Sequence, residues 1–211
     1  MTIVLKRVPG LCAVAASTAL VLVGCATAAP EPTPTAVSSA GSTAVTAAPT
    51  TTPAADPADP ATWVIDFGHV GPIAVGAALD EVAPLMTAFT DATQEACPWV
   101  TAYDAAGFPS VWLPDPSSTG SIEQVVLQAW GDPAAVGTDA LRTDAGIGVG
   151  STLDELRAAY PDLAEQPGKY APFYAIEDEQ GQWINFGANQ SGVVDTIVLR
   201  GEAKIDSEYC G

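Results

Sequence analysis

A ten-residue motif occurs twice in this chain, and its spacing constrains the fold more than any other feature. Residues 73–82 read IAVGAALDEV and residues 147–156 read IGVGSTLDEL, with identities at six positions and an offset of 74 residues. Self-similarity at a fixed spacing indicates that one folding unit is used twice. Because each motif passes from an extended apolar run through a glycine into a helical pattern, it predicts a turn followed by a helix start.

The second copy defines the helix start better than the first. Thr152 and Glu155 have the spacing of a capping box, and Pro161 ends the helical pattern. In the first copy Pro84 predicts a kinked or short helix. The Asp-Glu pair of both copies suits the positive end of a helix, so we assign it to helix capping rather than to acid–base or metal chemistry.

The similarity continues into the segments that follow each motif. Both segments have the composition of a β-hairpin with a glycine in its turn, followed by a further strand. The corresponding positions are Gly107/Gly181, Trp112/Phe186 and, after a slip of two residues, 120–127/192–199. We therefore predict an α+β fold of two tandem repeats, each a helix packed on a small antiparallel sheet of three to four strands. The repeats are residues 61–138 and 139–211, which together make one globular unit, 61–211.

The N-terminal segment predicts export. A basic pair, Lys6-Arg7, precedes an apolar run that ends at Val23, the pattern of a secretory signal peptide. The residues Leu22-Val23-Gly24-Cys25 resemble the lipobox of bacterial lipoproteins. That resemblance implies that residues 1–24 are a signal peptide, and that Cys25 carries a diacylglyceryl group with acyl chains such as palmitate. The alternative is an ordinary cleavable signal in which Cys25 has no role.

A lipidated Cys25 would determine where the protein resides. Two or three acyl chains hold a protein stably on a membrane, so we expect an extracytoplasmic protein anchored to the cell membrane by its N-terminal lipid. Residues 26–60 are nearly all Ala, Thr, Ser and Pro and offer almost nothing to bury. We therefore assign 25–60 to the lipidated N-terminus and a disordered tether, of a composition also typical of O-glycosylated stalks.

Charge limits the partners of the exported protein. Removal of residues 1–24 takes away two basic residues from a chain of net charge −18 and leaves five basic residues against 25 acidic ones. A strongly negative surface repels nucleic acid and anionic headgroups, so we expect neither as a direct partner.

Two cysteines remain once Cys12 leaves with the signal and Cys25 is lipidated. These are Cys97 and Cys210. An oxidising extracytoplasmic compartment favours a disulfide between them, although two separate buried thiols are the alternative.

The tandem arrangement resembles a known fold. A repeat of about 75 residues with the helix-start pattern Ile-x-x-Gly-x-(Ser/Thr)-x-x-(Asp/Glu)-(Val/Leu) is similar to the β-lactamase-inhibitor-protein-like fold and to small outer-membrane lipoproteins of the BamE/SmpA type. The resemblance implies the α+β layout and a protein-binding surface. Each repeat of those inhibitors contains its own disulfide, whereas Cys97 and Cys210 lie in different repeats here.

No catalytic, cofactor-binding or metal-binding motif stands out. The chain has one histidine, His69, and lacks a nucleophile elbow, a P-loop and a dinucleotide-binding fingerprint. With 25 acidic residues, a hydrolase that uses carboxylates alone remains an option. We expect no enzyme activity and no cofactor.

A binding face is the better candidate for function. One side of the last strands combines aromatic, aliphatic and arginine side chains, the composition of protein-binding surfaces. Its members are Val126, Trp130, Trp183, Val198 and Arg200. The alternative is that these side chains pack between the repeats. We therefore expect a non-catalytic binding module that engages a protein or cell-wall partner, with a structural or assembly lipoprotein of the envelope as the alternative. The sequence does not predict the oligomeric state.

Overall fold

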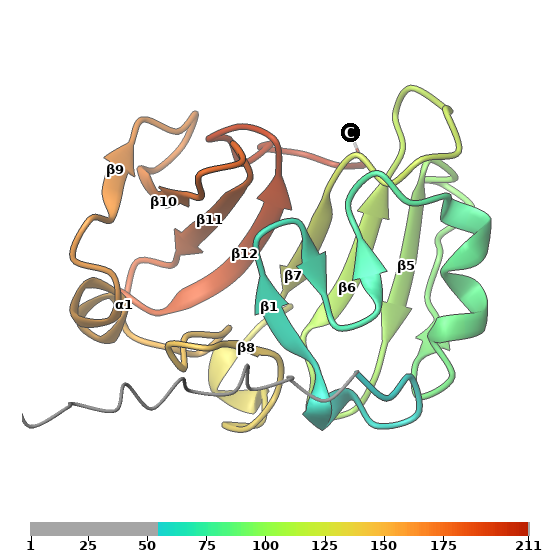
Figure 1. Ribbon diagram of the computed structural model, residues 1–211, viewed down its shortest axis with the longest axis horizontal. Helices are drawn as coiled ribbons and strands as arrows, with labels where there is room; N and C mark the ends of the chain where they lie inside the picture. The colour runs from blue at the N-terminus through green and yellow to red at the C-terminus, as the bar shows by residue number, and fades with distance from the viewer. Residues whose placement is uncertain (1–54, 211) are drawn as a thin grey trace, which may run out of the picture. The chain divides into compact units, whose positions relative to one another are not determined.

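Eight antiparallel strands form the main sheet of residues 55–210, the part of the chain that the computed structural model describes (Figure 1). In spatial order they are β4 (Thr90–Asp91), β5 (Val100–Asp104), β6 (Ser110–Pro114), β7 (Val125–Gln128), β12 (Val194–Arg200), β11 (Trp183–Ala188), β10 (Phe173–Glu177) and β9 (Ala164–Gln166). The central strands β7 and β12 pair with each other. The meanders β5–β7 and β10–β12 therefore meet at this central pair.

A smaller sheet covers one face of the main sheet, here called the inner face. Its order is β3 (Ile73–Ala74), β2 (His69–Val70), β1 (Val64–Asp66) and β8 (Arg142–Thr143). β1 and β8 pair in parallel, which joins the two extended segments that precede the repeated motifs. The two sheets enclose a hydrophobic core that includes Ile65, Val70, Ile73, Leu127, Phe186 and Leu199.

The two halves of the chain make the same backbone contacts around the repeated motif. In the first half the Gly76 N–H donates to the Ile122 carbonyl at 2.7 Å, and in the second the Gly150 N–H donates to the Val194 carbonyl at 2.8 Å. Gly76 and Gly150 have φ of 87° and 93°, a left-handed conformation that glycine adopts without steric cost.

Two further hydrogen bonds recur in both halves. The Leu79 N–H donates to the Gly120 carbonyl at 2.8 Å, and the Leu153 N–H donates to the Gly192 carbonyl at 2.9 Å. The donors of these pairs are 74 residues apart and the acceptors 72. The structure thus repeats the offset and the two-residue slip seen in the sequence.

The helices differ between the halves. The second contains α1 (Leu153–Ala159), with the capping box of Thr152 and Glu155 present, and Leu156 buried. The first contains two 3₁₀ helices, η2 (Leu79–Glu81) and η3 (Ala83–Leu85), which follow Ala78 without a side-chain cap. Pro84 accounts for the interruption, because its ring prevents regular α-helical hydrogen bonding. Two more 3₁₀ helices, η1 (Pro60–Thr62) and η4 (Pro133–Ala135), complete the described elements.

The arrangement is α+β and dominated by strands. It differs from the expected pair of helix-on-sheet units, because the strands join in one continuous sheet and α1 is the one α-helix within residues 55–210. The alignment of Trp112 with Phe186 also needs correction. Phe186 lies in the core between the sheets, whereas Trp112 lies on the opposite, outer face. Trp112 pairs with Val126, and Asn185 pairs with the equivalent Val198, so the structural counterpart of Trp112 is Asn185, one residue from the sequence alignment.

Candidate functional site

Residues 201–210 form a strap across the outer face of the main sheet. Figure 1 shows the chain returning from β12 toward the strands of the first half. Ile205 and Tyr209 of the strap pack on a second hydrophobic cluster, whose buried members are Cys97, Val100, Ala102, Trp112, Val126 and Val198. A disulfide between Cys97 and Cys210, 113 residues apart in sequence, holds the end of the strap to the first half.

Buried polar groups fix the beginning of the strap. The Asn185 side chain is fully buried, donates to the carbonyls of Val198 and Glu202 at 3.1 and 3.2 Å, and accepts from the Lys204 N–H at 3.0 Å. Its hydrogen-bonding capacity is therefore largely used, as a buried amide requires. The Arg200 guanidinium lies 2.6 Å from Glu202 and 2.8 Å from Asp206.

The predicted binding-face residues do not form one open surface. Val126 and Val198 are 0% exposed in the cluster on which the strap packs, and Arg200 is engaged by strap carboxylates. Trp183 is half-buried at the start of β11. Trp130 alone of the five has a freely exposed side chain, at 64%. The strap therefore leaves Trp130 available to a partner and withdraws the two valines.

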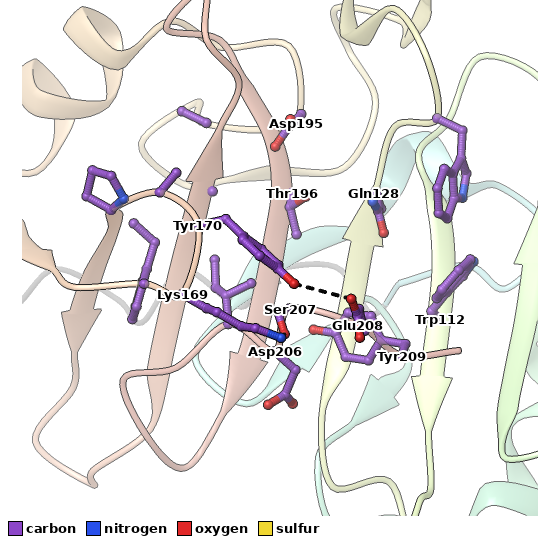
Figure 2. A pocket seen from close by; sticks show the side chains of 18 of the residues that line it. Trp112, Gln128, Lys169, Tyr170, Asp195, Thr196, Asp206, Ser207, Glu208 and Tyr209 are labelled. Carbon is purple, nitrogen blue, oxygen red and sulfur yellow. Dashed lines mark hydrogen bonds between the residues drawn. The ribbon is translucent and has the colours of Figure 1, made fainter. Parts of the chain in front are cut away.

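Trp130 lies at the margin of a groove of about 500 Å³ on the outer face. The loop 168–172 and strap residues 205–210 line it together with residues of β6, β7, β10, β11 and β12. Figure 2 shows Tyr170 reaching toward Glu208 of the strap, with Lys169 beside Ser207. The volume is within the range of ligand pockets, about 300–1,000 Å³.

Aromatic rings dominate the apolar part of this groove. The rings of Trp112 and Trp130 are 5.1 Å apart, and the ring of Tyr209 meets that of Trp112 edge-on at 6.1 Å. Tyr170 is 72% exposed, and its hydroxyl donates to a Glu208 carboxylate oxygen at 3.3 Å. Exposed rings of this size at a concave site are characteristic of binding surfaces.

A β-bulge brings Asp195 to the groove. β11 and β12 pair in register as far as Gly187 and Thr196, after which Ala188 pairs with Val194, so that Asp195 is the extra residue. Bulges of this kind redirect a side chain at the cost of one ladder position. Gly187 faces Thr196 next to the bulge, where a Cβ would lie 3.3 Å from the Thr196 Cβ, closer than an ordinary contact.

Burial and hydrogen bonding shift the pKa values of two groove carboxylates, Asp195 and Asp206, in opposite directions. Burial raises the pKa of Asp195, and a hydrogen bond from Thr196 only partly opposes this effect. Burial also acts to raise the pKa of Asp206, but hydrogen bonds from Lys204, Arg200 and Gln124 outweigh it and hold that pKa below its usual value. Asp206 is therefore a structural carboxylate of the strap, whereas Asp195 is the carboxylate whose pKa burial raises.

A second cavity, of about 570 Å³, lies beside α1 and the loop before it. Its Arg142 guanidinium already donates to the carbonyls of Thr138 and Gly146 and to the Ser151 hydroxyl. The main donor of this second cavity is engaged locally, and no aromatic residue among residues 55–210 lines it, so the outer groove is the stronger candidate site.

Residues 55–210 contain no cluster of three or more His, Cys, Asp or Glu side chains placed to hold a metal ion. No helix in the same range has the length and apolarity needed to cross a membrane. Cys25, the predicted lipidation site, lies outside the described residues.

The sequence indicated Trp130 but not its groove partners. Tyr170, Lys169 and Glu208 lie in loops, where no periodicity marks a face. Asp195 is part of a strand pattern, and the bulge that redirects it has no local signal beyond the facing Gly187.

No protein-family model, curated protein or solved structure matches this chain.

Proposed function

We propose that this protein is a non-catalytic binding module of the cell envelope, and that the outer groove is where it engages its partner. The observation that carries the proposal is the exposure of two large aromatic rings, Trp130 and Tyr170, at a groove of ligand-pocket size. Large rings exposed to water at a concave site gain free energy when a partner covers them, which is why aromatic residues lead binding hot spots.

The groove includes residues from both halves of the molecule. Gln128 of β7 and Thr196 of β12 face each other across the central strand pair, and both line the groove. Grooves between two structural halves are frequent ligand sites. The strap closes one side of the groove, so its disulfide also supports the shape of the site.

Capture from cell-envelope extract tests the proposal. Full-length wild type and the variants Trp130→Ala, Tyr170→Ala and Trp183→Ala would each be cross-linked and purified under the same conditions. We expect the groove variants to lose at least one specific partner by roughly tenfold, as truncation of a hot-spot aromatic does. Trp183 is a matched aromatic outside the groove, so Trp183→Ala should retain that partner.

Two results would contradict the proposal. One is identical recovery of every partner by Trp130→Ala, Tyr170→Ala and wild type. The other is selective loss by Trp183→Ala, which would move the binding surface to the beginning of β11.

A hydrolase is a second candidate, and the raised pKa of Asp195 in a groove that two further carboxylates line favours it. Asp206 and Glu208 lie on the strap that borders the same groove. This alternative requires saturable turnover of an envelope substrate that Asp195→Asn abolishes. Absence of turnover by wild type on glycan, ester and peptide substrates would leave the binding role.

The anchor is part of the same proposal. We infer that Cys25 is lipidated and holds the domain on the outer surface of the cell membrane, as the lipobox resemblance implies. Cys25→Ala should then release the protein into the medium or periplasm, measured by fractionation and immunoblotting. Unchanged retention in the membrane fraction would overturn the anchor without affecting the groove.

We also infer that the two halves, residues 61–138 and 139–211, are copies of one unit. The recurring hydrogen bonds of Gly76/Gly150 and Leu79/Leu153 support this inference. The helix of the first copy would have been lost to Pro84.

A further inference from the structure

The groove already holds an ammonium group of its own chain against an aromatic ring. The Lys169 Nζ lies 4.8 Å from the centroid of the Tyr170 ring and 3.3 Å from the Ser207 hydroxyl. A cation within about 6 Å of a ring face is attracted by the ring's quadrupole. The contact between Lys169 and Tyr170 therefore indicates that this end of the groove favours a cation.

The charge of the groove is predominantly negative. Asp195, Asp206 and Glu208 line it, and Lys169 is the one basic lining residue in the described part of the chain. Lys204 and Arg200 pair with Asp206, whereas Asp195 and Glu208 take part in none of the ion pairs within residues 55–210. Two carboxylates thus face the groove without a cationic partner, in a chain whose net charge is −18.

Aromatic faces and unpaired carboxylates are complementary to the same ligand chemistry. Rings attract a cation through their quadrupole, and carboxylates attract it by direct Coulomb interaction. The same carboxylates disfavour an anionic ligand, and a neutral ligand would leave them uncompensated. An organic cation satisfies both features at once, and its alkyl groups can contact the rings of Trp130 and Tyr170.

We propose that the groove binds an organic cation, an ammonium or guanidinium group, held against the Tyr170 and Trp130 rings and neutralised by Asp195 and Glu208. The proposal rests on the groove being the binding site. Lys169 lies over the ring of Tyr170 and would compete with the ligand's cation for that ring. Such a group is carried either by a free small molecule, such as choline, or by the lysine or arginine side chain of a peptide.

Tryptophan fluorescence tests the proposal directly, because Trp112 and Trp130 both line the groove. Full-length protein in detergent would be titrated with choline, with its uncharged isostere 3,3-dimethylbutan-1-ol, and with a short lysine peptide and its glutamine counterpart. We expect a saturable response to at least one cationic probe and about tenfold weaker binding of the matched neutral probe. Affinity should fall as salt is raised. The choline and peptide arms identify which source carries the cation.

Variants distinguish a specific cation site from a groove that binds probes by nonspecific hydrophobic contact. Tyr170→Ala, Asp195→Asn and Glu208→Gln should each weaken cation binding by roughly threefold to tenfold. Tyr170→Phe retains the ring but loses the hydroxyl that donates to Glu208, so it should bind the cation more tightly than Tyr170→Ala does. Lys169→Gln removes the competing ammonium and should strengthen binding, whereas Trp183→Ala should have no effect.

Equal affinity for choline and its neutral isostere, and for the lysine and glutamine peptides, would overturn the cation proposal. So would unchanged or weaker cation binding by Lys169→Gln. These failures are distinguishable from failure of the binding role itself. If Trp130→Ala loses its envelope partner while no cation binds, the groove is a site for another chemistry. If no groove variant affects capture, the binding role fails as well.

Discussion

The surroundings of Asp195 predict how its carboxyl group affects the stability of the folded domain. Its folded-state pKa is raised above the usual 3.8 because it is partly buried. The folded state therefore binds more protons than the unfolded state between 3.8 and the raised value, and stability falls as pH rises through that interval. At neutral pH the charged carboxylate destabilises the domain, which is a common property of residues kept for function.

Asp195→Asn should accordingly raise the melting temperature at pH 7. The gain should shrink as the pH falls toward 3.5, because the wild-type carboxyl becomes mostly protonated in both states. Thermal unfolding followed by circular dichroism at the two pH values measures this difference. Glu208→Gln, a matched change at an exposed groove position, should give little gain at pH 7. An Asp195→Asn variant less stable than wild type at pH 7 would contradict the assignment.

At the scale of elements, α1 depends on a cap that its counterpart lacks. The Glu155 N–H donates to the Thr152 hydroxyl at 3.2 Å, and the Thr152 N–H donates to the Glu155 carboxylate at 2.8 Å. In the first half Ala78 occupies the equivalent position and supplies no side-chain cap.

Thr152→Ala should destabilise the domain by about 1 kcal/mol, the usual effect of losing an N-cap hydroxyl. Urea unfolding at neutral pH, with the midpoint and slope both fitted, measures the loss. The reciprocal change Ala78→Thr should gain less than Thr152→Ala loses, because Pro84 still interrupts the helix. Equal stability of Thr152→Ala and wild type would show that packing of Leu156 alone determines α1.

Local patterns predicted the elements better than the site. The capping box, the glycine turns and the β-strand alternation depend on neighbouring residues, so they could be derived from the sequence. Alternation correctly separated the core side of β7 and β12, where Leu127 and Leu199 lie, from the side of Val126 and Val198. It could not show that the second side is covered as well. The strap has only Ile205 and Tyr209 as large apolar anchors among polar residues, so it resembles a solvated loop in sequence.

The groove could not be derived for a related reason. Its residues come from β6, β7, β10, β11, β12, loops and the strap, and their proximity follows from strand order rather than from sequence spacing. We expected a separate sheet in each repeat, and that expectation did not include the central β7–β12 pair on which this proximity depends.

At the scale of the whole molecule, the Cys97–Cys210 disulfide closes a loop that contains strands from both halves. A cross-link of this length stabilises by about 4–5 kcal/mol in the chain-entropy model. The double variant Cys97→Ala/Cys210→Ala should lose roughly that amount in urea unfolding, and its strap should become sensitive to proteolysis. Reduced wild type provides the matched control and should unfold with the double variant. A reduced protein that unfolds at the oxidised midpoint would contradict this role.

The central strand pair also has a consequence for association between molecules. Each half presents its last strand, β7 or β12, to the other half, so β7 of one molecule could pair equally well with β12 of a second. Domain swapping of this kind needs no new interface, only a connection that opens. The strap opposes domain swapping, because its Cys210 forms a disulfide with Cys97 of the same chain and so links the two halves covalently. Oxidation of Cys97 and Cys210 would thus determine whether the molecule closes on itself or exchanges halves with a neighbour.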